Sequence, residues 1–224
     1  MTQPPAAIEI ETAPAPDAAV IWLHGLGADG HDFETLVPEL RLPARLRLRF
    51  VFPHAPVRPV TINMGMPMRA WYDILQMGGG REDATGIRAS QGLLEALVAR
   101  ERGRGIAAAR IVLAGFSQGG AVALHTGLRH AERLGGVLAL STYLPLAATV
   151  AAERSAANRD LPVFLAHGSQ DPMIDIARAR DSRAFLEALG CAVQWREYAM
   201  PHSVCAEEVG DIAGWLLSRL APAP

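Results

Sequence analysis

The 224-residue chain contains no lysine, so every basic side chain other than histidine belongs to one of its 21 arginines. Without an amino side chain, a serine–lysine dyad, a Schiff base and the lysine of a phosphate-binding P-loop are all excluded. The formal net charge is -2 and the arginines are scattered along the chain. Nothing in this charge pattern indicates a nucleic-acid surface, so nucleic acid is not an expected partner.

Cysteine and long apolar runs are also scarce. The two cysteines, Cys191 and Cys205, lie in no C-x-x-C or other metal-ligand spacing. We therefore expect free thiols in a reducing compartment and no metal site. The N-terminus has no basic stretch followed by an apolar run, and no segment of about 18 uncharged apolar residues occurs. These absences predict a cytoplasmic protein without a membrane span.

Half of the residues are hydrophobic, which allows a sizeable core. The length suits one domain over residues 1–224, with a loose tail at about 221–224. The predicted strands are 19–23, 49–52, 111–114, 136–140, 163–166 and 193–198, and the predicted helices are 33–40, 86–102, 121–129, 176–189 and 207–220. Alternating apolar strands and helices predict an α/β fold with a mostly parallel central sheet flanked by helices. The connection between the fourth and fifth predicted strands is too short for a large lid domain.

The most informative segment is 111–120 (IVLAGFSQGG), where an apolar run ends at a lone serine and a helical pattern follows. A strand, a sharp turn and a helix around G-x-S-x-G form the nucleophile-elbow arrangement. Such a turn strains the backbone of Ser117 and requires small neighbours, which Gly115 and Gly119 provide. Backbone N–H groups at the start of the helix can stabilise a developing negative charge. The segment therefore predicts Ser117 as a nucleophile.

A serine hydroxyl needs a general base that an acid holds in place. In this arrangement the chain order is serine, acid, histidine, so both partners are sought downstream in loops that follow strands. Asp171 follows the fifth predicted strand in a tight polar loop, and His202 follows the sixth. Asp175 is the alternative acid, but it lies nearer the next helix and is expected to cap it. The predicted triad is therefore Ser117, Asp171 and His202.

An oxyanion hole needs two backbone donors. One is expected from Gln118, which follows the nucleophile, and the other from the loop after an early strand. That loop is 24–30 (HGLGADG), whose glycines permit the backbone angles that turn an N–H inward. Leu26 is the candidate donor in this loop. A phosphate cradle is the alternative use of a glycine-rich loop, but we do not expect a nucleotide site here.

The connection 53–85 has no helical periodicity and is long for a loop, so it is a candidate for function. Apolar residues alternate with others over 60–69, which predicts an extended segment with one apolar face. Four of the seven methionines lie in this connection: Met64, Met66, Met68 and Met77. Methionine is flexible and suits a pocket for varied acyl chains. Met64, Met66 and Trp71 are therefore the candidate substrate-binding residues, with ordinary core filling as the alternative.

Six blocks of sequence, in order along nearly the whole chain, resemble the phospholipase/carboxylesterase family of α/β-hydrolases, a group that includes acyl-protein thioesterases. The blocks are HGLGADG at 24–30, PHAP at 53–56, AWYD at 70–73, GFSQGG at 115–120, HGSQD at 167–171 and His202. The resemblance implies the α/β-hydrolase fold, the triad already named, oxyanion donors at Leu26 and Gln118, and Trp71 near an acyl pocket. Members of this family are found as monomers and as dimers, so a homodimer remains open.

These residues predict a serine carboxylesterase that hydrolyses short- to medium-chain esters through an acyl-enzyme. His202 takes the proton of Ser117, and Asp171 orients the imidazole and stabilises its charged form, so no metal or cofactor is required. The expected partner is a small-molecule or lipid ester. Acyl-protein thioesterase or lysophospholipase activity is the alternative within this class. A hydrolase-fold binding protein without catalysis is the alternative from a different class.

Overall fold

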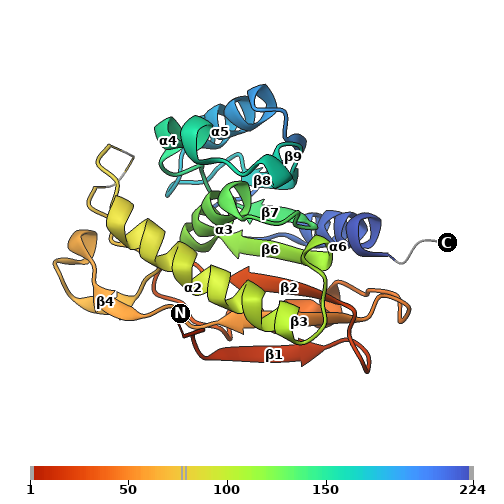
Figure 1. Cartoon of the computed structure of the whole chain (residues 1–224). Helices are drawn as coiled ribbons and strands as arrows, with labels where there is room; N and C mark the ends of the chain where they lie inside the picture. The colour runs from red at the N-terminus through yellow and green to blue at the C-terminus, as the bar shows by residue number, and fades with distance from the viewer. Residues whose placement is uncertain (1–2, 77, 79, 222–224) are drawn as a thin grey trace.

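A seven-stranded sheet with the strand order β1-β3-β2-β6-β7-β8-β9 organises the chain (Figure 1). The structure is a computed structural model that describes residues 3–76, 78 and 80–221, so Met77 and the last three residues of the expected tail lie outside the described residues. The strands are β1 (Ala7–Glu11), β2 (Ala18–Leu23), β3 (Leu48–Pro53), β6 (Ile111–Phe116), β7 (Gly136–Leu140), β8 (Pro162–Gly168) and β9 (Ala192–Tyr198). Neighbouring strands are parallel except β1, which pairs antiparallel with β3. The predicted mostly parallel α/β fold is confirmed.

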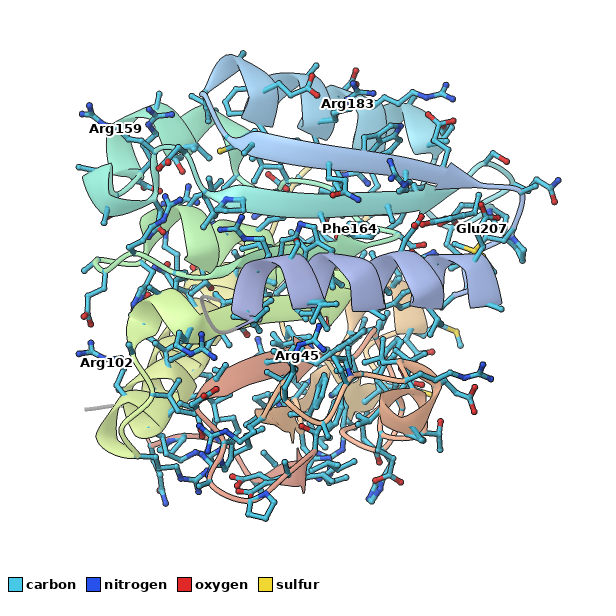
Figure 2. The ribbon with its side chains drawn as sticks, turned by 90° about the vertical axis from the view of Figure 1, so that its right-hand side faces the viewer. Arg45, Arg102, Arg159, Phe164, Arg183 and Glu207 are labelled. Atoms are coloured by element: carbon cyan, nitrogen blue, oxygen red, sulfur yellow. The ribbon has the colours of Figure 1, made fainter. Side chains whose placement is uncertain are left out.

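Helices cover both faces of this sheet. One face carries α2 (Ala84–Gly103), α3 (Gln118–Arg129), α4 (Ala147–Glu153) and α5 (Ile176–Ala188), and the other carries α1 (Leu36–Glu39) and α6 (Ala206–Leu220). Figure 1 shows α2 crossing in front of the sheet and α6 behind it. Figure 2 shows α6 lying along the sheet, with Phe164 of β8 close to it. The sheet is therefore the middle of three layers.

The strand β2 shows why the predicted strands are unbroken apolar runs. Ile21 and Leu23 pack into the core under α2 and α3, whereas Val20 and Trp22 pack into the core on the opposite face. Successive side chains of a strand point to opposite faces, so a strand covered on both sides needs apolar residues at every position. Sequence periodicity alone does not separate such a strand from a buried helix, but its short length does.

Two regions differ from the sequence predictions. Only α1 forms within the helix predicted at 33–40, and the chain turns at Arg41 with a φ of 46°. Within the extended segment predicted at 60–69, only β5 (Pro67–Arg69) is a strand, and it pairs with β4 (Val57–Pro59). A 3-10 turn at Thr61–Asn63 and a left-handed residue, Met64, separate the two strands. The alternation of apolar residues thus arises partly from a turn.

The edge of the sheet where the parallel strands end is not covered by an inserted domain. In the described part of the chain, β7 and β8 are joined by α4 and a 3-10 turn at Ala156–Asn158, so the prediction of no large lid is confirmed. Both cysteines are free thiols, as expected. None of the helices formed by the described residues is long and apolar enough to cross a membrane. The same residues contain no cluster of three or more His, Cys, Asp or Glu side chains placed to hold a metal ion.

Glu208, in the first turn of α6, is a buried acid without a partner. It is fully buried, and neither carboxylate oxygen has a hydrogen-bond partner among the described residues. Burial raises the pKa of Glu208 to about 8, and the nearby negative charge of Asp211 contributes to the rise. The folded protein therefore keeps this side chain protonated at neutral pH.

This buried acid predicts a pH-dependent stability. The carboxyl ionises near its ordinary pKa of 4.5 in the unfolded chain but only near 8 in the folded protein. The free energy of unfolding should therefore fall as the pH rises between these values, because the unfolded chain has fewer bound protons. Replacing Glu208 with glutamine should stabilise the protein by about 2–4 kcal/mol at about pH 9 and change little at about pH 4, as measured by denaturant unfolding. Glu207→Gln is the control, since Glu207 is exposed on the same turn (Figure 2); equal shifts in both variants would contradict the prediction.

Candidate active site

Ser117 occupies a sharp turn between β6 and α3. Its backbone has φ 53° and ψ -120°, a combination that strains any residue with a side chain. A Cβ on Gly119 would lie 2.4 Å from the carbonyl oxygen of Leu23, and one on Gly115 would lie 2.3 Å from the backbone of Gly119. The predicted strained serine between two residues that must be small is confirmed.

His202 and Asp171 meet from the loops that follow β9 and β8. The Nδ1 of His202 lies 2.6 Å from Oδ2 of Asp171, whose other oxygen accepts the N–H groups of Met173 at 2.8 Å and Ile174 at 3.0 Å. The Asp171 side chain is fully buried, and although burial raises its pKa, these hydrogen bonds hold the pKa below its ordinary value. Because an ionised carboxylate only accepts, Nδ1 of His202 carries the proton of this hydrogen bond.

Ser117 and His202 line the same cavity, which has a volume of about 280 Å³. Leu26 and Gln118 line it as well. The ring of Phe116 packs against the imidazole of His202 with the ring centres 4.7 Å apart, which limits the movement of the imidazole. Residues of the loop after β2, the turn between β6 and α3 and the loop after β9 therefore converge at one end of the sheet.

His24 orients the loop that contains Leu26. Its Nε2 accepts the N–H of Ala55 at 3.0 Å, so Nδ1 carries the proton and donates to the carbonyl oxygen of Gly25 at 2.7 Å. Burial lowers the pKa of His24, which keeps the ring neutral as these two bonds require. The C=O and N–H of a trans peptide point in opposite directions, so the N–H of Leu26 points away from His24.

The other expected donor lies at a helix terminus. Gln118 is the first residue of α3, so its N–H has no acceptor within the helix. The dipole of α3 also places partial positive charge at this end. Both N–H groups thus belong to residues that line the cavity, which is the arrangement an oxyanion hole requires.

The glycines of the same loop have the spacing G-x-G-x-x-G at Gly25, Gly27 and Gly30, which also occurs in dinucleotide-binding loops. Those loops open directly into a helix that binds the pyrophosphate, whereas α1 begins only at Leu36. The N–H of Gly27 donates to the carbonyl of Arg69 at 2.9 Å, and that of Gly30 donates to a ring nitrogen of His54 at 3.0 Å. These N–H groups are engaged within the protein, so the loop geometry does not support a nucleotide site.

The side chain of Gln118 has a structural role that the sequence did not reveal. Its Oε1 accepts the N–H of Trp71 at 2.7 Å, and its Nε2 donates to the carbonyl of Tyr72 at 2.7 Å. The indole N–H of Trp71 donates in turn to the carbonyl of His24 at 2.9 Å. This chain of bonds fastens the AWYD block to both the elbow and the loop with Leu26. The available signal in the sequence was the AWYD block itself, which the family resemblance singles out.

Replacing Gln118 with methionine should therefore lower stability strongly. The variant keeps the length of the side chain but leaves a buried N–H of Trp71 and a buried C=O of Tyr72 without partners, at about 1–3 kcal/mol each. We expect the free energy of unfolding to fall by about 2–5 kcal/mol and Tm by about 5–15 °C. The control is Gln170→Met at an exposed position, and an equal loss there would contradict this account.

The expected substrate groove does not coincide with the cavity that contains Ser117. Met64 is 85% exposed and Met66 is 48% exposed, and neither lines the cavity. Trp71 is buried and does not line the cavity either. The wall is formed mainly by residues 72–76, 78 and 80–83, with Tyr143 and Arg178 from elsewhere in the chain. This wall has no periodic pattern in the sequence, which is why sequence reasoning missed it.

The alternative acid is engaged elsewhere. Asp175 is the N-cap of α5, and its carboxylate accepts the N–H of Ala177 at 2.8 Å. This is the capping role expected from the sequence, and it leaves Asp171 as the carboxylate that contacts His202.

A mostly parallel sheet with a serine elbow after β6, an acid after β8 and a histidine after β9 defines the protein as a hydrolase with the α/β-hydrolase fold. Within this class, the chain belongs to the phospholipase/carboxylesterase family, whose sequence profile matches residues 5–218. The resemblance drawn from the six sequence blocks is therefore confirmed.

Similar proteins come from fungi and plants. The chain is 40% identical over 215 residues to acyl-protein thioesterase 1 of Gibberella zeae, covering 92% of both chains. It is 41% identical over 216 residues to acyl-protein thioesterase 1 of Yarrowia lipolytica, covering 94% of this chain and 95% of that protein. The crystal structure of acyl-protein thioesterase 2 of Zea mays superposes with a TM-score of 0.86 at 27% identity, covering 96% of this chain and 99% of that chain.

Proposed function

We propose that this protein hydrolyses acyl thioesters through a triad of Ser117, His202 and Asp171. The observation that carries the proposal is the 2.6 Å contact between Nδ1 of His202 and Oδ2 of Asp171, with His202 and Ser117 lining one cavity. A neutral histidine whose Nδ1 donates to a carboxylate can accept a proton at Nε2, which is what an inert hydroxyl needs to become a nucleophile. The family assignment supports the same roles.

The reaction proceeds in two displacements. His202 takes the proton of Ser117 as the hydroxyl oxygen attacks the acyl carbon, and Asp171 stabilises the resulting imidazolium. The N–H groups of Leu26 and Gln118 stabilise the oxyanion of the tetrahedral intermediate. The thiol leaves with the proton, and water then attacks the acyl-enzyme by the same route. Every step uses side chains and N–H groups of the chain itself.

Thioester hydrolysis is favoured over the carboxylic ester hydrolysis that the sequence analysis placed first. The similar fungal proteins and the similar maize structure are named acyl-protein thioesterases. A thiol has a pKa of about 8.5, so a thiolate leaves readily even before it is protonated. The oxyanion hole then supplies most of the transition-state stabilisation that the reaction needs. Carboxylic ester hydrolysis is the second candidate, supported by the description of the family. It uses the same residues but depends more on proton donation by His202.

The test compares matched substrates. A thioester and an oxygen ester with the same acyl chain should both be hydrolysed, and kcat/KM should be at least about tenfold higher for the thioester, corresponding to about 1.4 kcal/mol. A fluorophosphonate probe should label the protein at Ser117, since only an activated serine reacts. The reverse substrate order would favour a carboxylesterase. Absence of both labelling and hydrolysis would instead indicate a binding protein on the hydrolase fold.

A further inference from the structure

Two hollows meet at one pair of side chains. The cavity that contains Ser117 has a volume of about 280 Å³, and a neighbouring hollow has a volume of about 250 Å³. Tyr143 and Arg178 line both. The neighbouring hollow extends over α4 and α5 and includes the apolar side chains of Leu144 and Phe185. The two side chains therefore separate the hollow that contains Ser117 from a second one able to contact hydrocarbon.

The separating pair is a stack. The guanidinium carbon of Arg178 lies 3.8 Å from the centre of the Tyr143 ring. The hydroxyl of Tyr143 lies 3.1 Å from that of the buried Tyr72, which holds the hydroxyl end of the ring. The tyrosine ring is thus held in place by the protein interior, whereas the arginine covers it from α5.

Arg178 differs from its neighbours on α5. Arg180 and Arg183 form ion pairs with Glu197 and Glu187. The described ion pairs do not include Arg178, and its guanidinium instead lies over an aromatic ring. A long side chain that lies against a surface in this way fills space with its methylene groups as well as with its charge. The position of Arg178 is therefore suited to closing a passage.

We propose that the stack of Arg178 on Tyr143 is a partition that limits the length of the acyl chain that the cavity accepts. This inference rests on the proposed acyl hydrolysis at Ser117. A short acyl chain fits within the first cavity, whereas a longer chain meets the stack and cannot reach the second hollow. Removing the arginine side chain joins the two hollows and lets the end of a longer chain lie against Leu144 and Phe185.

The nearby charges argue that bulk, not charge, is the property that matters. Glu82 lines the cavity with Arg178, and its carboxylate accepts the N–H of Leu146 at 3.0 Å. Asp181, one turn further along α5, lines the second hollow. Acids thus lie on both sides of the guanidinium, so it does not create a cationic pocket for an anionic substrate.

The test measures chain-length preference in matched variants. Arg178→Ala opens the partition, Arg178→Met keeps an unbranched side chain without charge, and Arg183→Ala is the control. Arg183 lies on the same helix (Figure 2), stacks on Trp195 at 5.9 Å and lines neither hollow. The readout is the ratio of kcat/KM for hexadecanoyl and octanoyl thioesters below their critical micelle concentrations. Because each newly buried methylene raises kcat/KM about fourfold, two or more should raise this ratio at least about tenfold in Arg178→Ala.

Arg178→Met and Arg183→Ala should keep the ratio of the parent within about threefold, which is less than the effect of one newly buried methylene. An unchanged ratio in Arg178→Ala, or an equal rise in either of the other variants, would overturn the partition. Hydrolysis of the octanoyl thioester by the parent tests the proposed function separately. Binding of hexadecanoate to the Ser117→Ala variant and to the double variant Ser117→Ala, Arg178→Ala gives the same comparison without turnover. Tighter binding by the double variant supports the partition, and equal binding by the two variants contradicts it.

Discussion

Replacing Ser117 with alanine is expected to lower kcat by about 10⁴- to 10⁶-fold while the fold stays intact. Alanine removes the oxygen that attacks the acyl carbon but keeps the Cβ, so the strained turn is unchanged. The Ser117 side chain forms no capping hydrogen bond with α3 that the substitution would remove. The measurement is kcat on a thioester, with the thermal unfolding curve as a check on folding. Ser169→Ala, at an exposed position in the loop after β8, is the control.

Replacing Ser117 with glycine separates the loss of the nucleophile from the effect of backbone strain. Ser117→Gly should be as inactive as the alanine variant, yet more stable than it by about 1–2 kcal/mol. The reason is that glycine tolerates φ 53° and ψ -120° without the steric cost that any Cβ incurs. Activity of the alanine variant within tenfold of the parent would refute the nucleophile assignment. A glycine variant less stable than the alanine variant would contradict the claim that a side chain strains the backbone at position 117.

Replacing Asp171 with asparagine should lower kcat by about 10⁴-fold. The N–H groups of Met173 and Ile174 hold the oxygen at the Oδ1 position, so the new amide group must face His202. Two donors would then meet at the 2.6 Å contact with Nδ1. The proton of the imidazole would then move to Nε2, so Nε2 could no longer accept the proton of Ser117.

Asp175→Asn is the matched control for this substitution, because asparagine caps a helix as well as aspartate does. Its kcat should stay within about twofold of the parent, and a larger loss there than in Asp171→Asn would reverse the assignment of the acid. Stability gives a second readout. The pKa of Asp171 is lowered in the folded protein, so its ionisation stabilises the fold above the ordinary pKa. That contribution is lost as the pH falls through the folded value, and the asparagine variant should lack this acid-dependent loss.

The strands could be predicted from the sequence only in part. The runs that became β2, β6 and β7 are apolar at every position because both faces are covered, and this property is written in the sequence. In contrast, β1 alternates between half-buried and exposed residues at the edge of the sheet, so its pattern is weak. The helix α4 was also missed, since Val150 is its buried residue and the rest of its surface carries little pattern.

The methionine groove shows where local pattern fails. Alternation over 60–69 indicates that apolar side chains share a face, but it does not say whether another element covers that face. Here the hairpin leaves Met64 and Met66 exposed, and Met64 adopts a left-handed backbone that interrupts the extended run. The wall of the cavity comes instead from residues such as Tyr143 and Arg178, which lie far apart in the chain. No window of sequence contains them together.

The sequence by itself determined the positions of Ser117, Asp171 and His202, because each follows an apolar run and such runs in alternation with helices must end at a common edge. It also determined the small residues around the elbow, since only glycine fits there. Tertiary structure alone decided the tautomer of His24, the hydrogen bonds of the Gln118 side chain and the stack of Arg178 on Tyr143. The physical reason is that backbone periodicity is a local property, whereas the partner of a side chain depends on which distant segments pack beside it.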